Sequence, residues 1–363
     1  MSRTIDQLQK HLQKEVFHYA QDGKKAAGRA LGTIIEIITY YKLCAWGFSK
    51  HILIEKRIPE FGRDDIRHNV EFSLHRTGKE KLYDVPRGMM INGRFLAKIE
   101  GAVVNRPSEQ LMSSTGILRN AAVISETERH LLVADLMEVR KDSLSVLVAQ
   151  VDPIPRAIFE CKRVGVEEGM KKGPQSIEKA KQGAYVARSV SALQKIIDRG
   201  GNVLGYLPTD TGEPIIDRYD VILAKIVTRE IEAPEGFVLT VGVTSNHGNW
   251  FTAEDHNKEL RVLAAAYDWL LFLTDEGLCE FVEECMLGDD PQLAPVKKAF
   301  LESYSGKKGG NRFTKTRIDL DAHQALRQFF VAHDRRSDGW FNVITPRDAS
   351  LPTLSEQLRV LVT

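Results

Sequence analysis

The chain has few of the features that mark secreted, membrane or zinc-binding proteins. Four cysteines occur in 363 residues, and they form no C-x₂-C pair or Cys/His grouping, so we expect reduced thiols rather than disulfides or zinc ligands. No apolar run approaches the roughly 20 residues that span a bilayer, and the start of the chain lacks the basic-then-apolar order of a signal peptide. These absences predict a cytoplasmic protein that has no contact with a membrane.

The sequence also lacks an excess of charge of one sign and the motifs of two common classes of site. Lys and Arg number 50 and Asp and Glu number 49, so binding to a polyanion would depend on local patches. The pattern G-x₄-G-K-[ST] is absent, which predicts no nucleotide cofactor. The ten histidines form no H-x₃-H or HNH-like grouping, and this disfavours a nuclease that binds its metal through histidines.

The spacing of apolar residues predicts two helices before residue 50 and then a series of strands. Strands are expected at Ile52–Glu55, Asn69–His75, His130–Met137, Leu144–Val151, Ala157–Val164, Val203–Leu207, Val221–Val227 and Phe237–Val243. The segment Leu144–Val151 also fits a short helix. A long helix is expected up to about Asp198, and further helices are expected from Glu254 to about Leu287.

These elements predict an α/β or α+β fold in which helices flank a central mixed β-sheet. The catalytic strands are expected between about residues 130 and 165. We assign residues 1–290 to a core with insertions and residues 291–363 to a C-terminal extension. The extension contains Ser305–Arg317, a loop with five cations that could follow the phosphates of DNA, although a solvated surface loop fits the same pattern.

The segment Glu160-Cys161-Lys162 sets a carboxylate and an amine two residues apart where an apolar run ends. On a strand, residues two apart share one face. A carboxylate ligates Mg²⁺ through its oxygens, and an ammonium beside it can orient a water or neutralise charge on a phosphate. The pair therefore suits metal-assisted hydrolysis of a phosphodiester.

The surroundings of this pair resemble those of a known superfamily. An acid, a turn, the strand with E-x-K, a loop and a helix follow one another between Val148 and Arg188. This order is similar to that of the PD-(D/E)xK nucleases, which include most type II restriction endonucleases and the mismatch-repair nicking enzymes. The resemblance covers about the middle of the chain. It implies a restriction-endonuclease-like core, a Mg²⁺ cofactor, Glu160 as metal ligand and Lys162 as the group that polarises or positions the attacking water.

A second acid is needed to complete the metal site, and Asp152 is the leading candidate. It ends the strand before the turn Pro153–Ala157, so antiparallel pairing across that turn would bring it near Glu160. The short separation of the two acids resembles that of the mismatch-repair nicking nucleases. An Asp that initiates a turn before proline is the structural alternative.

Two other acids remain open for the same role. Asp135 lies in an apolar strand-like segment, at a longer separation that restriction enzymes also show. Glu71 follows a helix that carries Glu36, as the first acid of the superfamily often does. Were Glu71 the ligand, Arg76–Arg156 would be an insertion between two core strands, which is a large departure from the usual plan and counts against it.

Two helices carry further candidates. Gly28, Gly32 and Glu36 recur four residues apart, so they form one helical stripe that could place Glu36 beside the metal site, as the resemblance implies, or leave it exposed on a packing helix. Gln182 and Tyr185 share a face of the helix after the E-x-K strand. The resemblance implies that Gln182 holds a phosphate, although such a face also packs on a sheet.

These expectations predict a Mg²⁺-dependent, sequence-specific endonuclease of double-stranded DNA, most similar to a type II restriction enzyme. The resemblance implies a homodimer, because two-fold symmetry matches palindromic DNA. A structure-selective nuclease of DNA repair or recombination is the alternative. A non-catalytic DNA-binding protein, in which the E-x-K strand is purely structural, belongs to a different class and remains open.

Overall fold

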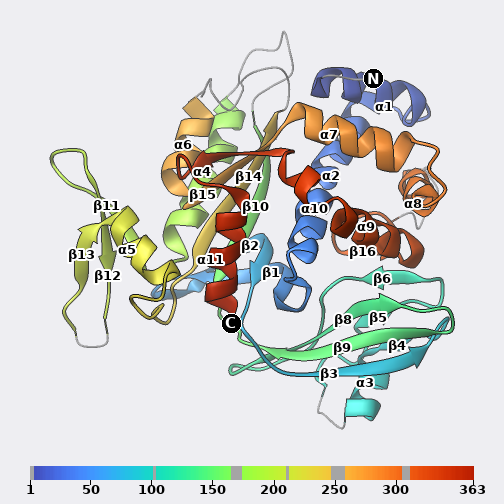
Figure 1. Cartoon of the computed structure of the whole chain (residues 1–363), viewed down its shortest axis with the longest axis horizontal. Helices are drawn as coiled ribbons and strands as arrows, with labels where there is room; N and C mark the ends of the chain where they lie inside the picture. Colours follow the sequence, from blue (N-terminus) through green and yellow to red (C-terminus); the bar gives the residue numbers. More distant parts are fainter. Residues whose placement is uncertain (1–3, 101–103, 165–173, 210–211, 247–257, 305–310) are drawn as a thin grey trace.

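The computed structural model describes residues 4–100, 104–164, 174–209, 212–246, 258–304 and 311–363 (Figure 1). The described residues form a central six-stranded sheet with the order β1-β2-β10-β14-β15-β17. Its strands are β1 (Ile52–Glu60), β2 (Arg63–Leu74), β10 (Ala157–Val164), β14 (Leu239–Asn246), β15 (Trp269–Leu273) and β17 (Phe341–Thr345). Strands β10, β14 and β15 run parallel and the other pairs run antiparallel. The expected central mixed sheet is confirmed.

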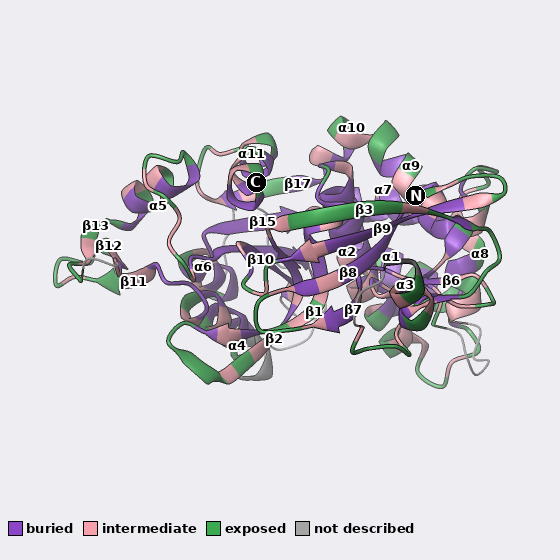
Figure 2. Ribbon diagram, turned by 90° about the horizontal axis from the view of Figure 1, so that it is seen from below, coloured by how far each residue is buried: buried purple, intermediate pink, exposed green. Residues whose placement is uncertain are grey.

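Helices cover both faces of this sheet. Helix α2 (Gly23–Ala45) packs on one face through Ile34 and Ile38, which join Phe72 and Phe159 in the main core. Helices α4 (Pro174–Ser189) and α6 (Lys258–Ala266) lie together on the other face (Figure 1). Strands β14 and β15 are buried along their whole length, as is usual for parallel strands covered on both sides, and Figure 2 shows β10 and β15 largely buried.

A large insertion separates β2 from its neighbour β10. The chain leaves the sheet after Leu74 and returns at Ala157, and these two residues are paired across the two strands. Between them come β3 (Thr77–Pro86), β4 (Ile91–Asn92), α3 (Gly93–Glu100), β5 (Gln110–Met112), β6 (Ile117–Arg119), β7 (Ala122–Glu126), β8 (Leu131–Val139) and β9 (Ser143–Val151). Their described residues form a sheet β3-β9-β8-β7 and part of a sheet β16-β6-β5-β4.

This insertion changes the expected pairing of the strands between residues 130 and 165. Strands β8 and β9 exist as predicted, but they pair with each other and with β7 and β3, not with β10. Their apolar pattern identified them as strands, whereas the identity of a strand's partner depends on contacts that are distant in sequence. The beginning of β10 pairs with β2 on one edge and with β14 on the other.

The segment after residue 290 takes part in both sheet systems. It forms α8 (Ala294–Ser303), β16 (Arg317–Asp319), α9 (Leu320–Ala332), α10 (Asp334–Asp338), β17 and α11 (Leu351–Val362). Strand β16 pairs with β6 of the insertion, and β17 pairs with β15 at the edge of the central sheet. The residues assigned to a C-terminal extension are therefore integral to the fold.

Other elements confirm or correct the predicted ones. The two N-terminal helices are confirmed as α1 (Ile5–Glu15) and α2. The expected strand at Val221–Val227 is wrong, because these residues lie in α5 (Tyr219–Val227), and the expected helical run after Glu254 contains strand β15. Short apolar runs of this kind fit a buried helix and a buried strand equally well.

The remaining elements are the 3₁₀ turn Ser49–His51, β11 (Gln194–Ile197), β12 (Val203–Leu207), β13 (Ile215–Arg218), α7 (Asp275–Val282) and the π-helical turn Glu283–Leu287.

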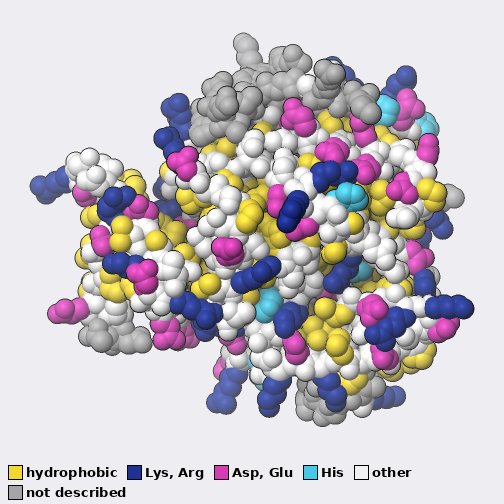
Figure 3. All heavy atoms as spheres, viewed as in Figure 1, with side chains coloured by type: hydrophobic (Ala, Val, Ile, Leu, Met, Phe, Trp, Pro, Cys, Tyr) yellow, Lys and Arg dark blue, Asp and Glu magenta, His cyan; other side chains and the backbone are white. Residues whose placement is uncertain are grey.

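Strands β11, β12 and β13 form an arm that projects from the body at the left of Figure 1. Hydrophobic side chains are visible on its surface in Figure 3, and Ile197 and Ile216 are exposed by 69% and 58%. On the face drawn in Figure 3, cations and anions are interspersed rather than gathered into one patch.

Within the described part of the chain, no helix has both the length and the apolar character needed to cross a membrane.

Close packing at Gly242 positions an aromatic ring beside the E-x-K strand. Gly242 on β14 is paired with Glu160 on β10. A Cβ at Gly242 would lie 2.8 Å from Leu270 Cδ1 and 2.9 Å from Tyr267 Cδ2. These separations are shorter than ordinary contacts between carbon atoms, so the absence of a side chain lets the ring of Tyr267 pack against the strand next to Glu160.

We predict that Gly242→Ala lowers the free energy of unfolding by about 1–3 kcal/mol, because the added methyl group overpacks the contact with Tyr267. The matched control is Gly32→Ala in α2, where no described atom outside the helix backbone lies within 4 Å of the new Cβ. This control should gain up to about 1 kcal/mol from helix propensity. Urea unfolding of both variants measures the difference, and a Gly242→Ala variant as stable as the wild type would contradict the packing described.

Candidate active site

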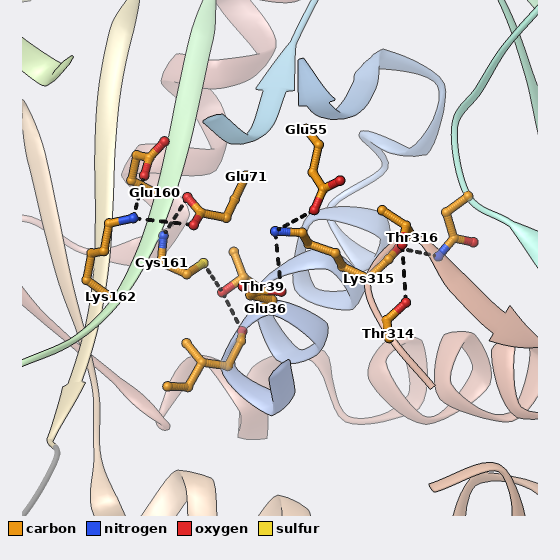
Figure 4. Close-up of polar contacts among 12 residues, drawn as sticks. Glu36, Thr39, Glu55, Glu71, Glu160, Cys161, Lys162, Thr314, Lys315 and Thr316 are labelled. Atoms are coloured by element: carbon orange, nitrogen blue, oxygen red, sulfur yellow. Dashed lines mark hydrogen bonds and ion pairs between the residues drawn. The ribbon is translucent and has the colours of Figure 1, made fainter. Parts of the chain in front are cut away.

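Glu160 and Lys162 lie on one face of β10, close to its carboxyl end (Figure 4). Lys162 Nζ is 3.0 Å from Glu160 Oε2. The Glu160 side chain is 4% exposed and the Lys162 side chain is 35% exposed. Both face the side of the sheet that α4 covers, since Lys162 Cε is 3.9 Å from the position that a Cβ would take at Gly183 of α4. The pair thus joins a buried carboxylate to a cation that reaches the surface.

Glu71 on β2 is the second carboxylate of this cluster. Its Oε1 lies 3.4 Å from Lys162 Nζ, and its Oε2 accepts a hydrogen bond of 3.3 Å from the backbone N–H of Cys161. The Glu71 and Glu160 carboxyl groups lie close enough for each to shift the pKa of the other. Because β2 and β10 are neighbouring strands of the central sheet, two acids more than eighty positions apart in sequence meet here. The structure brings together Glu71, Glu160 and Lys162.

The structure does not bring Asp152 or Asp135 to the cluster. Asp152 is exposed at the junction of the insertion and β10, and its backbone carbonyl accepts a 2.7 Å hydrogen bond from His75 Nδ1. The pairing assumed for Asp152 required β9 and β10 to form a hairpin, and β9 lies in the sheet of the insertion instead. Asp135 is buried in β8, where it accepts a hydrogen bond from Ala121 N and where burial raises the pKa of its carboxyl to about 6.

Glu36 lies beside the cluster but contacts a lysine that the sequence did not single out. Lys315 Nζ is 3.3 Å from Glu36 Oε2 on α2 and 3.5 Å from Glu55 Oε1 on β1 (Figure 4). Burial raises the pKa of Glu36, Lys315 opposes that rise, and the negative charge of Glu71 adds to it. A row of carboxylates with two intervening lysines therefore extends from Glu160 to Glu55.

The backbone is distorted at the point where Glu71 enters the site. Glu55 lies between the paired residues Ile54 and Lys56 of β1 and has φ of 53°, and Glu71 lies between their partners on β2. Phe72 belongs to the core beneath α2, whereas Val70 belongs to the core on the opposite face, although residues two apart on a regular strand share a face. The left-handed conformation of a non-glycine residue costs on the order of 1–3 kcal/mol and is found preferentially at functional sites.

Helix α4 presents Gly183 to the cluster, rather than the predicted Gln182. Gln182 is exposed, and Tyr185 is 54% exposed and hydrogen-bonded to Glu60, away from Lys162. A Cβ at Gly183 would lie 3.1 Å from the hydroxyl oxygen of Tyr267. That hydroxyl is buried and has no hydrogen-bond partner among the described residues. Sequence reasoning missed Gly183 and Tyr267, and no motif marks either of them.

The cations of the candidate DNA-contact loop are largely committed to ion pairs where they are described. Arg312 pairs with Glu302, and Lys315 pairs with Glu36 and Glu55. Residues 305–310 of this loop, and residues 165–173 after β10, lie outside the described residues. The described part of the loop thus contributes to the site through Lys315.

Burial and mutual repulsion separate the ionisation of the two acids. Burial, together with the hydrogen bond and the charge of Glu71, raises the pKa of Glu160 to about 8, although Lys162 opposes the rise. Burial also acts to raise the pKa of Glu71, but the hydrogen bond from Glu160 and the ammonium groups of Lys162 and Lys315 outweigh it, so the pKa is lowered. At neutral pH the two acids therefore share one proton, held mainly by Glu160.

Lys162 remains a cation. Burial alone would lower the pKa of its ammonium, but the charges of Glu160 and Glu71 outweigh burial and raise it. A lysine with a raised pKa does not act as a base near pH 7. Lys162 can therefore orient a water or stabilise negative charge, and does not abstract a proton.

The donor set fits a magnesium ion. Magnesium is usually bound by one or two carboxylates together with waters and substrate phosphate, and Glu71 and Glu160 offer such oxygens. Glu160 Oε1 is buried without a hydrogen-bond partner in the described part of the chain. Among the described residues, no three His, Cys, Asp or Glu side chains form a metal-binding group, so a cation here would complete its coordination with water and substrate oxygens.

Comparison of the chain with protein-family models, with curated proteins and with solved structures gives no match. Function is therefore inferred from the geometry and chemistry of the site.

The raised pKa of Glu160 predicts how stability depends on pH. Its pKa is about 8 in the folded chain and 4.5 for the ordinary side chain, so the folded state binds the proton more tightly between these values. The resulting stabilisation is complete below about pH 4.5 and is lost as pH rises through 8. Relative to Glu160→Gln, which cannot ionise, wild-type protein in a metal chelator should lose about 1–4 kcal/mol of unfolding free energy between pH 5 and 9.

Urea unfolding at a series of pH values measures this difference. The control is Glu178→Gln, which changes a Glu side chain that is 59% exposed on α4. It should leave the pH dependence as in the wild type. Parallel pH profiles for wild type and Glu160→Gln would show that Glu160 has an ordinary pKa and would contradict the shared proton.

Proposed function

We propose that the protein is a Mg²⁺-dependent endonuclease that cleaves double-stranded DNA at specific sequences, as type II restriction enzymes do. The observation that carries this proposal is the ammonium of Lys162 held 3.0 Å and 3.4 Å from the carboxylates of Glu160 and Glu71. Two acids and a cation in this arrangement suit phosphodiester hydrolysis, because they supply oxygen ligands for a metal and a fixed positive charge for the phosphate or the attacking water.

Each residue has a role that follows from its surroundings. Glu71 and Glu160 would hold Mg²⁺, and the hydrogen bond from Cys161 N orients the Glu71 carboxylate. When bound, Mg²⁺ supplies Lewis-acid polarisation of a phosphate oxygen and offsets its charge. The Lys162 ammonium, fixed by both carboxylates and 35% exposed, orients the attacking water and stabilises charge that develops on the phosphate.

The order of elements supports the resemblance to the PD-(D/E)xK superfamily. A helix with Glu36 precedes the strands, and the E-x-K strand β10 is followed by helix α4 and by the parallel strand β14. With Glu71 as the first acid, Arg76–Arg156 form the insertion between two core strands that had counted against this choice. The insertion is accommodated because Leu74 and Ala157 are adjacent in the sheet.

The proposal includes a symmetric dimer. The described part of one chain carries one such site, and cleavage of both strands of a palindromic duplex is most simply done by two sites related by two-fold symmetry. The exposed cations Arg57, Arg63 and Arg67 of the β1–β2 hairpin lie on the strand pair that carries Glu71, and they are candidates for contacts with the phosphates of the duplex.

We predict that purified wild-type protein cuts phage and plasmid DNA into discrete fragments only when Mg²⁺ is present. Lys162→Ala should reduce the cleavage rate by about 100-fold or more, because a positioned group of this kind contributes at least that factor. Gel electrophoresis of the digests measures both results. The control is Lys297→Ala, since the Lys297 side chain is also 35% exposed and lies on α8; it should cleave like the wild type.

The same assay separates the candidate acids. Glu71→Gln should lose cleavage as Lys162→Ala does, whereas Asp152→Asn should retain it. Cleavage of branched or damaged DNA without discrete fragments from plasmid would favour a structure-selective repair nuclease. Binding of DNA without Mg²⁺-dependent cleavage of any substrate would contradict the enzymatic proposal and favour a binding protein.

A further inference from the structure

Lys315 is a buried cation enclosed by acids next to the proposed metal site. The residue is 8% exposed, and its ammonium lies 3.3 Å from Glu36 and 3.5 Å from Glu55 (Figure 4). A lysine buried to this extent needs compensating charge. The contacts with two separate elements, α2 and β1, supply that compensation.

The position of Lys315 is fixed by the insertion. The Asn120 side-chain N–H donates a 2.9 Å hydrogen bond to the backbone carbonyl of Lys315, and Asn120 N donates one of 3.1 Å to the carbonyl of Thr316. Strand β16, which follows directly, pairs with β6 of the insertion. Lys315 is therefore held by ordered backbone and is not a mobile surface side chain that happens to reach an acid.

The two lysines divide the carboxylates of this region into two sets. Lys162 lies between Glu71 and Glu160, and Lys315 lies between Glu36 and Glu55. The charge of Lys315 also acts on Glu71, whose pKa it helps to lower. Without the Lys315 ammonium, Glu36 and Glu55 would face Glu71 as unneutralised carboxylates, which is an arrangement that attracts a divalent cation.

We propose that Lys315 is a positioning residue whose ammonium occupies the place of a second divalent cation. It holds Glu36 and Glu55, and so limits the site to one metal ion, bound by Glu71 and Glu160. This inference rests on the proposed function, because it concerns the metal stoichiometry of the same site. It also gives the C-terminal segment a defined role, since that segment supplies the second cation from its own sequence.

The test is the number of Mn²⁺ ions bound per chain, measured on the full-length protein by electron paramagnetic resonance of free Mn²⁺ or by calorimetry. Mn²⁺ serves as the probe because it favours the same oxygen ligands as Mg²⁺. Wild type should bind about one ion, and Lys315→Met, which keeps the aliphatic stem but removes the charge, should bind about two. Lys315→Arg keeps the cation and should bind as the wild type does.

Lys56→Met is the matched control. Lys56 is the neighbour of Glu55, its side chain is 18% exposed, and it pairs with Glu126 of the insertion, so its loss should not change the stoichiometry. A structural role for Lys315 would lower the unfolding temperature of Lys315→Met without adding an ion. Circular dichroism identifies a variant that has not folded. In that case Lys315→Gln, which removes the charge but keeps a polar group beside Glu36 and Glu55 and should also bind about two ions, replaces Lys315→Met.

The outcomes distinguish this inference from the proposed function. Two ions in the wild type, or one ion in both wild type and Lys315→Met, would overturn the role of Lys315 and leave the nuclease proposal standing. No ion in the wild type would overturn the metal site itself, and with it both proposals. One ion in the wild type that is lost in Glu160→Gln, together with a second ion in Lys315→Met, is the result expected.

Discussion

The contact between two carboxyl groups, Glu160 and Glu71, is the constraint on which the rest of the site depends. Burial of Glu160 beside a second acid is unfavourable unless a proton or a cation lies between them. In the described chain the Lys162 ammonium lies between the two acids, and the raised pKa of Glu160 favours its protonated form. In the proposed function a divalent cation takes the place of that proton, because deprotonation is the condition for metal binding. The atoms that neutralise the buried acids are therefore the same atoms that the proposed function assigns to metal binding and phosphodiester hydrolysis.

The surrounding fold serves this contact from several distant segments. Pairing of β2 with β10 sets the two acids side by side, and the absence of a side chain at Gly242 lets the Tyr267 ring pack against β14 beside Glu160. The insertion leaves and rejoins the sheet at adjacent residues, so it adds a domain without separating the acids. The insertion in turn anchors the loop that carries Lys315. A change in the insertion could thus reach the site through its hydrogen bonds to that loop.

Local features of the site were predictable and non-local ones were not. Period-two alternation was sufficient to predict that Glu160 and Lys162 share a face of a strand, and helical spacing was sufficient to predict the helix that carries Glu36. The choice of Asp152 over Glu71 failed as a prediction of proximity, because β9 precedes β10 in sequence but lies in another sheet. The backbone distortion at Glu55 changes the face of the sheet to which neighbouring side chains point. Lys315 reaches the site through contacts made across the whole chain. Neither feature leaves a pattern in the sequence.

The most direct test of the metal site is anomalous diffraction at the manganese edge from crystals grown with Mn²⁺ and duplex DNA. We predict an anomalous peak within bonding distance of the carboxylates of Glu71 and Glu160, with a phosphate oxygen among its neighbours and Lys162 beside it. A peak at Asp152 or Asp135, or a duplex bound with no peak between Glu71 and Glu160, would contradict the account.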